Sequence, residues 1–322
     1  MSESEWEELA TSNGGAHEHS FAYGEVAEMV LGTPPLRLIS RSSDGGVACI
    51  QGTGSTRTPG GTIRVGGMSG GPILKGHDQE SPARVLMRDL EARLRRHLAG
   101  RLVIHEWRDT PLAGVLGDIG YRVERSVGVY EVDLSKGIQK VWEGMHPNKR
   151  RKIRQAERKG VKFRESKEGI EIAQGMFDEA GRRGKFKPLR RKWTEGYLKI
   201  YGRRDMATLY MVTLESDPVS CALVLRHGKT AFCPAAGSLK KGWFARPNDY
   251  MHWMIMRAEF ERGITRYNMG GVNTDPGSPA YGVYRWKREY GGGVRMQDVF
   301  TKTLSPVMVR IRSGISGIKS LL

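Results

Sequence analysis

Patterns that mark a metal site, a disulfide scaffold or a membrane span are missing from this sequence. The three cysteines, Cys49, Cys221 and Cys233, are an odd number without CxxC spacing, and the eight histidines show no HExxH spacing. No run reaches the roughly 18 apolar residues that a membrane-spanning helix needs. We therefore expect a soluble protein in a reducing cytoplasm, with no metal and no disulfide framework.

The amino terminus also lacks the basic-then-apolar order of a signal peptide. Its first stretch, MSESEWEELATSNGG, is acidic and then small and polar. This composition predicts a disordered segment over residues 1–19.

Acidic residues are few beside basic ones. The chain has 52 Lys and Arg against 35 Asp and Glu, a formal net charge of +17 over 322 residues. Such an excess points to partners such as nucleic acid, an anionic membrane surface or phosphorylated substrates. The 39% hydrophobic content supports a sizeable core. Because single cores stop growing at about 250–300 residues, we expect two domains.

The hydrophobic pattern runs through strands and helices, and then restarts after Leu134. Two successive passes of alternating strands and helices predict an α/β protein made of two similar halves. The halves do not visibly repeat in sequence.

A strongly basic helix is predicted at HPNKRRKIRQAERKG, His146 to Gly160. Pro147 suits the first helical position and Gly160 suits the left-handed residue past the end. Ile153 and Ala156 form only a narrow apolar stripe. The charged positions include Lys149, Arg150, Arg151, Lys152, Arg154 and Arg158. Like charges crowded on one helix destabilise it, so we consider both a phosphate-binding helix and a plain solvated face.

The segment YNMGGVNTDPGSPAYGVYRWKREYGG, residues 267–292, is the most informative part of the second half. A strand ends at Gly270 and Gly271, where a backbone without Cβ atoms lets a ligand come close. Lys287 follows inside an aromatic cluster. Taken alone, this lysine is either a snorkelling surface residue or a positioned cation at a pocket wall, and the residues favour snorkelling.

The order of the basic helix, TEGYL, AAGS and then YNMGG…YRWK…YGG resembles the FemABX family of aminoacyl-tRNA-dependent transferases, which build peptidoglycan bridges. The resemblance is strongest from Val141 to Phe300, with an echo at GGMSGGPIL. It implies two tandem modules like GCN5-related N-acetyltransferases (GNAT), packed side by side, with mixed central sheets flanked by helices. The chain has no room for a coiled-coil tRNA arm, so it resembles the short, armless branch.

The resemblance places module boundaries and partners. We expect a first module over 20–134, a second over 135–300, and a C-terminal segment, 301–322, that returns to the first module as in some members. It implies aminoacyl-tRNA as co-substrate, no bound cofactor, and a peptide, nucleotide-linked or lipid-linked acceptor. We expect a monomer. The terminal helix, with Val307 and Ile311 on one face, either docks on the protein or makes a peripheral membrane contact.

The resemblance also gives roles to single residues. Lys287 of YRWK matches the lysine proposed to stabilise charge on the attacked ester, and Asp109 lies near an acid that contacts the acceptor. Further substrate-binding positions are Arg190, Arg191, Tyr197, Trp243, Phe244 and Tyr281. Trp243 and Phe244 stand where the family has tyrosines, and the acceptor lysine of the first module has no counterpart. These departures favour an unusual acceptor, from the cell wall or a natural-product pathway.

The residue types suit attack of an amine on an aminoacyl ester. Negative charge develops on the carbonyl oxygen, and a positioned cation stabilises it. The ester is already activated, so no nucleophilic Ser or Cys is required. Solvent, the carboxylate of the substrate or Asp109 could each take the proton of the amine. The basic helix, from Lys149 to Arg158, would then face tRNA phosphates.

Two other functions fit the composition. An acyl-CoA-dependent N-acyltransferase shares the fold, but holds the pyrophosphate on a glycine-rich turn before a helix. The matching turn here is LKKGWFARP, which lacks that pattern, and RVGGMSG is only a partial match. A non-catalytic RNA- or membrane-binding module is the third alternative, although no RNP, KH or double-stranded-RNA signature is present.

Overall fold

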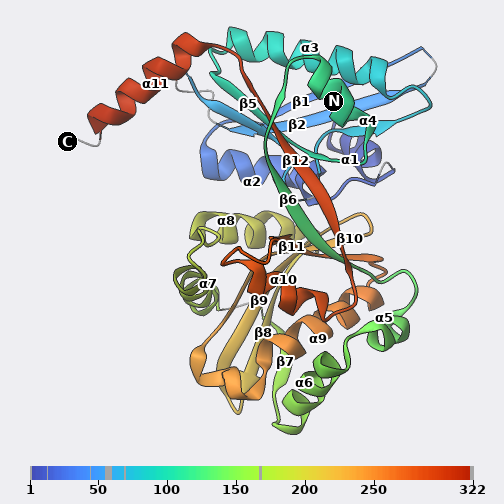
Figure 1. The fold of residues 1–322 in the computed structure, drawn as a ribbon, viewed down its shortest axis with the longest axis vertical. Helices are drawn as coiled ribbons and strands as arrows, with labels where there is room; N and C mark the ends of the chain where they lie inside the picture. Colours follow the sequence, from blue (N-terminus) through green and yellow to red (C-terminus); the bar gives the residue numbers. More distant parts are fainter. Residues whose placement is uncertain are drawn as a thin grey trace. The chain divides into compact units, whose positions relative to one another are not determined.

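The computed structural model describes residues 2–12, 14–43, 45–54, 60–68, 70–166 and 169–319, with side chains in the last helix described to residue 313. Contacts divide the chain into two compact units (Figure 1). Unit 1 comprises Met1–Val127 and Met296–Leu322, and unit 2 comprises Gly128–Arg295. None of the described helices is both long and apolar enough to cross a membrane.

Unit 1 is a mixed sheet with helices. Its elements are α1 (Glu3–Ser12), η1 (His17–His19), α2 (Phe21–Leu31), β1 (Leu36–Arg41), β2 (Val47–Gly54), β3 (Thr62–Val65), β4 (Ile73–Lys75), α3 (Glu80–Arg96), β5 (Arg101–Trp107), α4 (Pro111–Asp118) and α11 (Pro306–Lys319). The strand order is β1-β2-β3-β5 followed by β12 (Gly293–Thr303), and β4 pairs with β2. Only the β3–β5 pair among these is parallel. Helix α3 buries Leu86, Leu90 and Leu94 at helical spacing in the core of unit 1.

Residues 3–12 correct the prediction of a disordered terminus. They form helix α1, in which Trp6 is 1% exposed and packs with Ala10 against Cys49 and Ile73. The indole nitrogen of Trp6 also donates to the carbonyl of His19 at 2.6 Å. Trp6 and Ala10 lie four residues apart, so they share one helix face although the surrounding positions are mostly polar.

Unit 2 contains the longer strands. Its elements are α5 (Ile138–Gly144), α6 (Pro147–Arg158), β7 (Lys162–Ser166), α7 (Ile170–Gly184), α8 (Arg191–Gly196), a π-helical turn η2 (Tyr197–Tyr201), η3 (Gly202–Arg204), β8 (Ala207–Leu214), β9 (Asp217–His227), β10 (Thr230–Ser238), η4 (Lys240–Ala245), α9 (Pro247–Glu261), β11 (Arg266–Val272) and α10 (Tyr281–Arg288). The strand order begins with β6 (Arg122–Asp133) and continues β11-β10-β9-β8-β7. Pairing is antiparallel except between β10 and β11, which α9 connects.

Two strands, β6 (Arg122–Asp133) and β12 (Gly293–Thr303), pass from one unit to the other. The unit boundaries therefore fall inside strands, at Val127/Gly128 and Arg295/Met296, rather than at the expected residues 134/135 and 300/301. Residues Gln297–Thr303 of β12 pair with β5 in unit 1. A pattern of alternating residues marks a strand but carries no sign of where along it the partners change.

The sheet of unit 2 separates two helical layers. Tyr210 and Val212 of β8 belong to the core cluster that includes Met251 and Ile255 of α9. On the other face, the thiol of Cys221 lies 3.8 Å from the carbonyl of an α7 residue. Side chains alternate between the faces of a strand, so both faces of this central sheet are covered.

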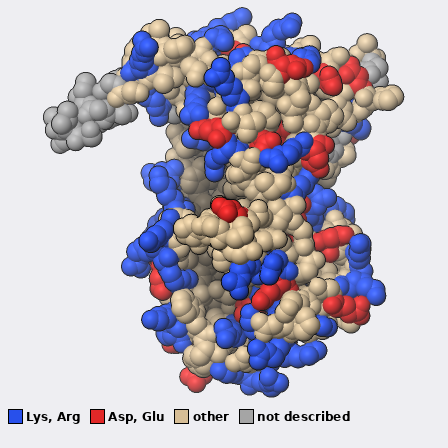
Figure 2. Space-filling model, in the orientation of Figure 1, with Lys and Arg blue, Asp and Glu red and all other residues tan. Residues whose placement is uncertain are grey.

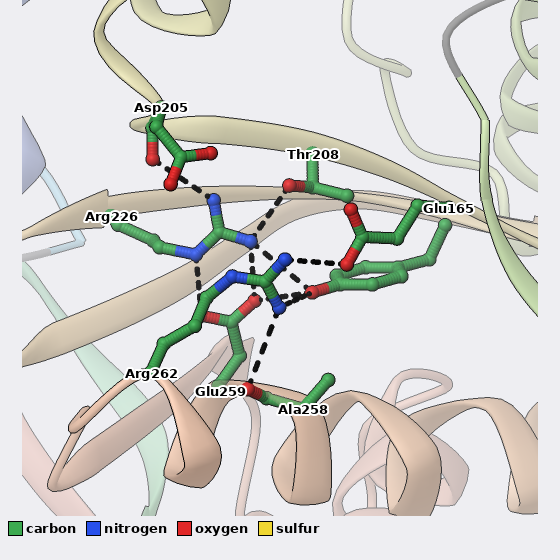
Figure 3. Close-up of polar contacts among 8 residues, drawn as sticks. Glu165, Asp205, Thr208, Arg226, Ala258, Glu259 and Arg262 are labelled. Atoms are coloured by element: carbon green, nitrogen blue, oxygen red, sulfur yellow. Dashed lines mark hydrogen bonds and ion pairs between the residues drawn. The ribbon is translucent and has the colours of Figure 1, made fainter.

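A buried polar network joins α9 to β8 and β9 (Figure 3). Arg226 donates to both carboxylate oxygens of Glu259, at 2.6 and 2.7 Å, and to Thr208 Oγ1 at 2.7 Å. The Tyr210 hydroxyl donates to Glu259 at 2.7 Å, and Arg262 reaches the same hydroxyl at 3.1 Å. Because each buried charge has a partner, the network fixes the position of α9 without an orphaned ion.

Candidate functional site

Lys287 is a buried cation rather than a snorkelling one. It lies on α10, is 8% exposed, and donates through Nζ to the carbonyls of Met269, Gly270 and Gly271 at 2.6, 3.2 and 3.0 Å. Burial lowers the pKa of Lys287 to about 8, with a weaker opposing effect from Cys233. The preference for a snorkelling surface lysine was wrong, because α10 directs this side chain toward β11.

An irregularity in β11 creates the carbonyl site that receives Lys287. The pairing with β6 shifts register between Asn268 and Gly271. Gly270 has φ +79°, a left-handed conformation that favours glycine, and its N–H donates to Asn268 Oδ1 at 2.7 Å. Residues Arg266–Asn268 of β11 pair in parallel with Thr230–Phe232 of β10, and this regular pairing ends just before the irregularity. Three successive carbonyls at the end of the regular pairing thus meet one ammonium group.

Two further buried groups lie near this lysine. His252 is 5% exposed and its Nδ1 lies 2.8 Å from the Tyr267 hydroxyl. Burial, helped by the charges of Lys287 and Lys149, lowers the pKa of His252 to about 3. Burial also raises the pKa of Cys233 to about 11, against the opposing effects of Tyr267 and Lys287. At neutral pH this region therefore holds a neutral imidazole and a neutral thiol.

Lys149 is fully buried, which removes it from the predicted tRNA-binding set. Its Nζ lies 2.5 Å from Asp249 and 3.4 Å from Glu289. It also lies 4.5 Å from the ring centroid of Trp286 and 4.2 Å from that of Tyr290. The Trp286 indole donates to the same Asp249 oxygen at 2.9 Å. Lys149 therefore anchors α6 to α9 and to the helix that carries Lys287.

The sequence carried a signal for this burial. Lys149, Ile153 and Ala156 follow the i, i+4, i+7 spacing of one helix face, and all three are buried. The carboxylate partner of Lys149, Asp249 on α9, lies 100 positions away in the sequence, so no local pattern could identify this ion pair. His252 likewise lies on α9 without a motif of its own.

The rest of α6 faces outward. Arg151, Arg154 and Arg158 are exposed and Arg150 is partly exposed. Lys152 is partly covered and pairs with Glu289 at 3.0 Å. On the face drawn in Figure 2, Lys and Arg cover more area than Asp and Glu. Four arginines of α6 thus remain accessible, and Lys152 is held beside an acid.

The predicted acceptor residues of unit 2 are spread over several elements. Arg190 and Arg191 line a cavity of about 590 Å³ beside α7. Arg191 is held by Glu171 and by Glu195, the latter at 2.7 Å, and these carboxylates raise its pKa. Tyr197 is 4% exposed and lies edge-on to Tyr201 at 5.4 Å between ring centroids. The tyrosine is therefore packed inside the unit while the two arginines are exposed.

The aromatic candidates Trp243 and Phe244 lie on η4 and are 38% and 59% exposed. Trp243 donates to Ser238 Oγ at 3.1 Å, and Lys159 at the end of α6 lies 4.6 Å from the Phe244 ring. Tyr281 lies on α10, with its ring centroid 5.8 Å from that of its neighbour Tyr284. Asp109 is exposed in unit 1, in the turn between β5 and α4.

The start of α9 differs from a pyrophosphate-binding helix end. Pro247 occupies the first helical position, where it has no N–H to donate. Asp249 places an acid in the first turn, where it already compensates the helix dipole. The side-chain amide of Asn248 donates to Ser238 Oγ at 3.0 Å. Arg246, the residue just before α9, has a left-handed backbone conformation with φ +57°.

Comparison with known proteins gives one domain match. Residues 146–288 match the family model described as an acetyltransferase (GNAT) domain, a range that runs from the start of α6 to the end of α10. No curated protein matches the chain.

Solved structures resemble almost the whole chain. A crystal structure of FemX has a TM-score of 0.74 at 14% identity, covering 92% of this chain and 96% of that one. L-PGS from Bacillus licheniformis has a TM-score of 0.56 at 14% identity, with 96% of each chain covered. A tandem GNAT protein from the clavulanic acid biosynthesis pathway has a TM-score of 0.55 at 12% identity, covering 94% and 95%. The predicted fold is confirmed: this chain has the FemABX-type tandem GNAT architecture.

Proposed function

We propose that the protein is an aminoacyltransferase that moves an amino acid from aminoacyl-tRNA to an amine of a peptide or of a peptidoglycan-precursor-like acceptor. The observation that carries the proposal is the buried ammonium of Lys287, held by three backbone carbonyls at the irregularity of β11. Within the part of the chain that the structure describes, this ammonium group has only neutral hydrogen-bond partners, so its charge is available to an oxyanion. The FemX-like fold supports the same reaction class.

In the proposed reaction, the acceptor amine attacks the ester carbonyl carbon of the aminoacyl-tRNA. A C–N bond forms, and the carbonyl oxygen becomes an oxyanion that the Lys287 ammonium stabilises. The C–O bond to the ribose then breaks, the amine nitrogen loses a proton, and the ribose oxygen gains one. All three N–H donors of Lys287 contact carbonyls, so one of these contacts must be exchanged for the substrate oxygen. No covalent enzyme intermediate is required.

The remaining candidates take supporting roles in this proposal. The accessible arginines of α6, Arg150, Arg151, Arg154 and Arg158, contact tRNA phosphates. Arg190 and the aromatic residues of η4 contact the acceptor, while Arg191 is shared with two acids. Asp109 or solvent takes the proton of the amine. The acceptor belongs to a cell-wall or a natural-product pathway.

An acyl-CoA-dependent N-acyltransferase is the second candidate, favoured by the GNAT domain match over residues 146–288. The start of α9 argues against it, because Pro247 has no N–H to donate where the pyrophosphate would bind. The two candidates therefore differ in which anion the protein recognises.

A binding titration separates them. Purified protein is titrated with total charged tRNA at several salt concentrations, and with acetyl-CoA in parallel. The proposal predicts tRNA binding of micromolar affinity or tighter that weakens steeply with salt, without a response to acetyl-CoA. Binding of acetyl-CoA without binding of tRNA would make the protein an ordinary acyltransferase.

A further inference from the structure

A cavity of about 450 Å³ opens in unit 2 where the start of α6 meets α10. Its lining residues are His146, Lys152, Gly282, Arg285, Trp286, Arg288 and Glu289. The backbone N–H of His146 donates to the carbonyl of Glu289 at 2.9 Å, which ties the two segments together. The cavity is therefore built on fixed backbone rather than on a loop.

The cavity carries an excess of positive charge. Arg285 and Arg288 are exposed, and no hydrogen bond or ion pair of either side chain occurs among the residues that the structure describes. The one acid in the lining, Glu289, is held by Lys152 at 3.0 Å and by the buried Lys149 at 3.4 Å. The two lysines thus compensate the negative charge of Glu289. The charges of Arg285 and Arg288 are therefore available to a ligand.

His146 adds a ring N–H donor. Its Nδ1 accepts the N–H of Asn148 at 3.2 Å, as the capping residue of α6. In the neutral ring this contact leaves the proton on Nε2, so that nitrogen is a donor. The positive end of the helix dipole lies at the same place. An arginine pair, an imidazole N–H and a helix start together form a set of donors without a matching acceptor.

We propose that this cavity is a phosphate-binding subsite in which Arg285 and Arg288 bind the oxygens of a nucleotide phosphate. Planar guanidinium groups suit this ligand, because they bind phosphate oxygens in pairs. The identity of the ligand rests on the proposed function. Lys287 lies between the two arginines in the sequence but is buried, while they are exposed. Arg285 and Arg288 lie three residues apart on α10, so their side chains share one face of the helix and can bind the same ligand.

The phosphate has two possible sources in the proposed reaction. One is a phosphodiester near the 3′ end of the tRNA, and the other is the diphosphate of a nucleotide-linked acceptor. Both present the same oxygens to the arginines. A short RNA hairpin that ends in single-stranded CCA represents the first source, and uridine diphosphate represents the second.

The test compares two double variants of the full-length protein. Arg285→Gln with Arg288→Gln removes the two cavity cations. Lys162→Gln with Arg164→Gln removes two exposed cations from strand β7, none of whose residues lines the cavity. Both variants lose the same charge, and thermal unfolding checks that both fold. Binding of the hairpin and of uridine diphosphate is measured at several salt concentrations.

We expect the cavity variant to bind the hairpin about tenfold more weakly than the control, with a salt slope flatter by about 1.4 for two lost single-strand contacts. Loss of uridine diphosphate binding alone would assign the subsite to the acceptor. If the cavity variant matches the control for both ligands, the subsite is refuted.

Transfer assays with charged tRNA keep this result separate from the proposed function. A wild-type enzyme that transfers, together with a cavity variant that binds like the control, refutes the subsite and leaves the function standing. A wild-type protein that transfers from no charged tRNA refutes the function, and the two binding measurements still decide whether the cavity binds phosphate.

Discussion

Lys149 and Lys287 are both buried in unit 2, yet their surroundings differ. Lys149 is 0% exposed and has a carboxylate at 2.5 Å, a second at 3.4 Å and two aromatic rings. Lys287 is 8% exposed and has three backbone carbonyls at 2.6 to 3.2 Å. A buried cation with a negative partner is bound in place, whereas one with only neutral partners keeps its charge for a ligand. The comparison separates a structural lysine from a catalytic candidate.

The largest expected effect is a loss of folding stability when Lys149 is replaced. Lys149→Met leaves Asp249 buried without its cation, and breaking such a pair from one side destabilises a protein by about 3–5 kcal/mol. Urea unfolding of the full chain measures the change. Lys152→Met, which removes a partly exposed partner of Glu289, is the matched control and should cost about 1 kcal/mol or less.

The double variant Lys149→Met with Asp249→Leu sharpens the result. It removes both charges of the pair, so it should regain much of the lost stability. A loss in the single variant no greater than that of Lys152→Met would show that Lys149 does not hold α6 to α9.

The second prediction concerns the rate of transfer when Lys287 is replaced. Lys287→Met removes the cation from the carbonyl site and should lower the transfer rate by about 10²–10³, the usual effect of losing one oxyanion-stabilising donor. Single-turnover transfer from charged tRNA measures it. Lys136→Met, an exposed lysine of the same unit, is the control.

Binding should separate catalysis from folding in this variant. Lys287→Met should bind tRNA nearly as the wild type does, because Lys287 is buried whereas the arginines of α6 are accessible. Turnover equal to that of the control would remove Lys287 from the mechanism.

The two faces of α6 extend the same comparison. Arg151→Gln with Arg154→Gln removes two exposed cations, so tRNA binding should weaken about tenfold and its salt slope should flatten by about 1.4 to 1.8. Filter binding at several salt concentrations measures both. Lys162→Gln with Arg164→Gln is again the charge-matched control, and equal behaviour of the two variants would identify the outer face of α6 as merely solvated.

The sequence predicted a good part of this architecture. Pro147 and Gly160 mark the ends of α6, which runs from Pro147 to Arg158 and is followed by Gly160 at φ +73°. The alternation of strands and helices predicted the two halves, and the YRWK motif singled out Lys287. These features are local, because caps, periodicity and short motifs depend on neighbouring residues.

Features that depend on distant residues were not predictable in the same way. The burial of Lys149 follows from Asp249, which no local pattern connects to α6. The carbonyl site for Lys287 depends on a register shift in β11, and pleated alternation gives no sign of such a shift. The helix at Trp6 was missed because two apolar residues are too few to stand out among acids.

The pH dependence of transfer gives the smallest expected effect. Burial lowers the pKa of Lys287 to about 8. The ammonium form is the active one in the proposed reaction, so activity that depends on it is present below this pKa and is lost as the pH rises through it. At a pH of about 9 the transfer rate should be roughly tenfold below its plateau. Lys287→Arg, whose guanidinium stays charged, should move the alkaline limb upward even if its plateau is lower.

A stability measurement makes this prediction independent of the substrate. The pKa of Lys287 is lower in the folded protein than in the unfolded chain, so between these two values the unfolded chain binds more protons. The free energy of unfolding should therefore rise with pH above about 8, by linkage. The Lys287→Met variant should show a smaller rise, because Lys149, whose pKa burial also lowers, still contributes in the same direction. Two results together would show that the buried ammonium is not the group that titrates. The alkaline limb of the transfer rate would be the same in Lys287→Arg as in the wild type, and the free energy of unfolding of Lys287→Met would depend on pH as that of the wild type does.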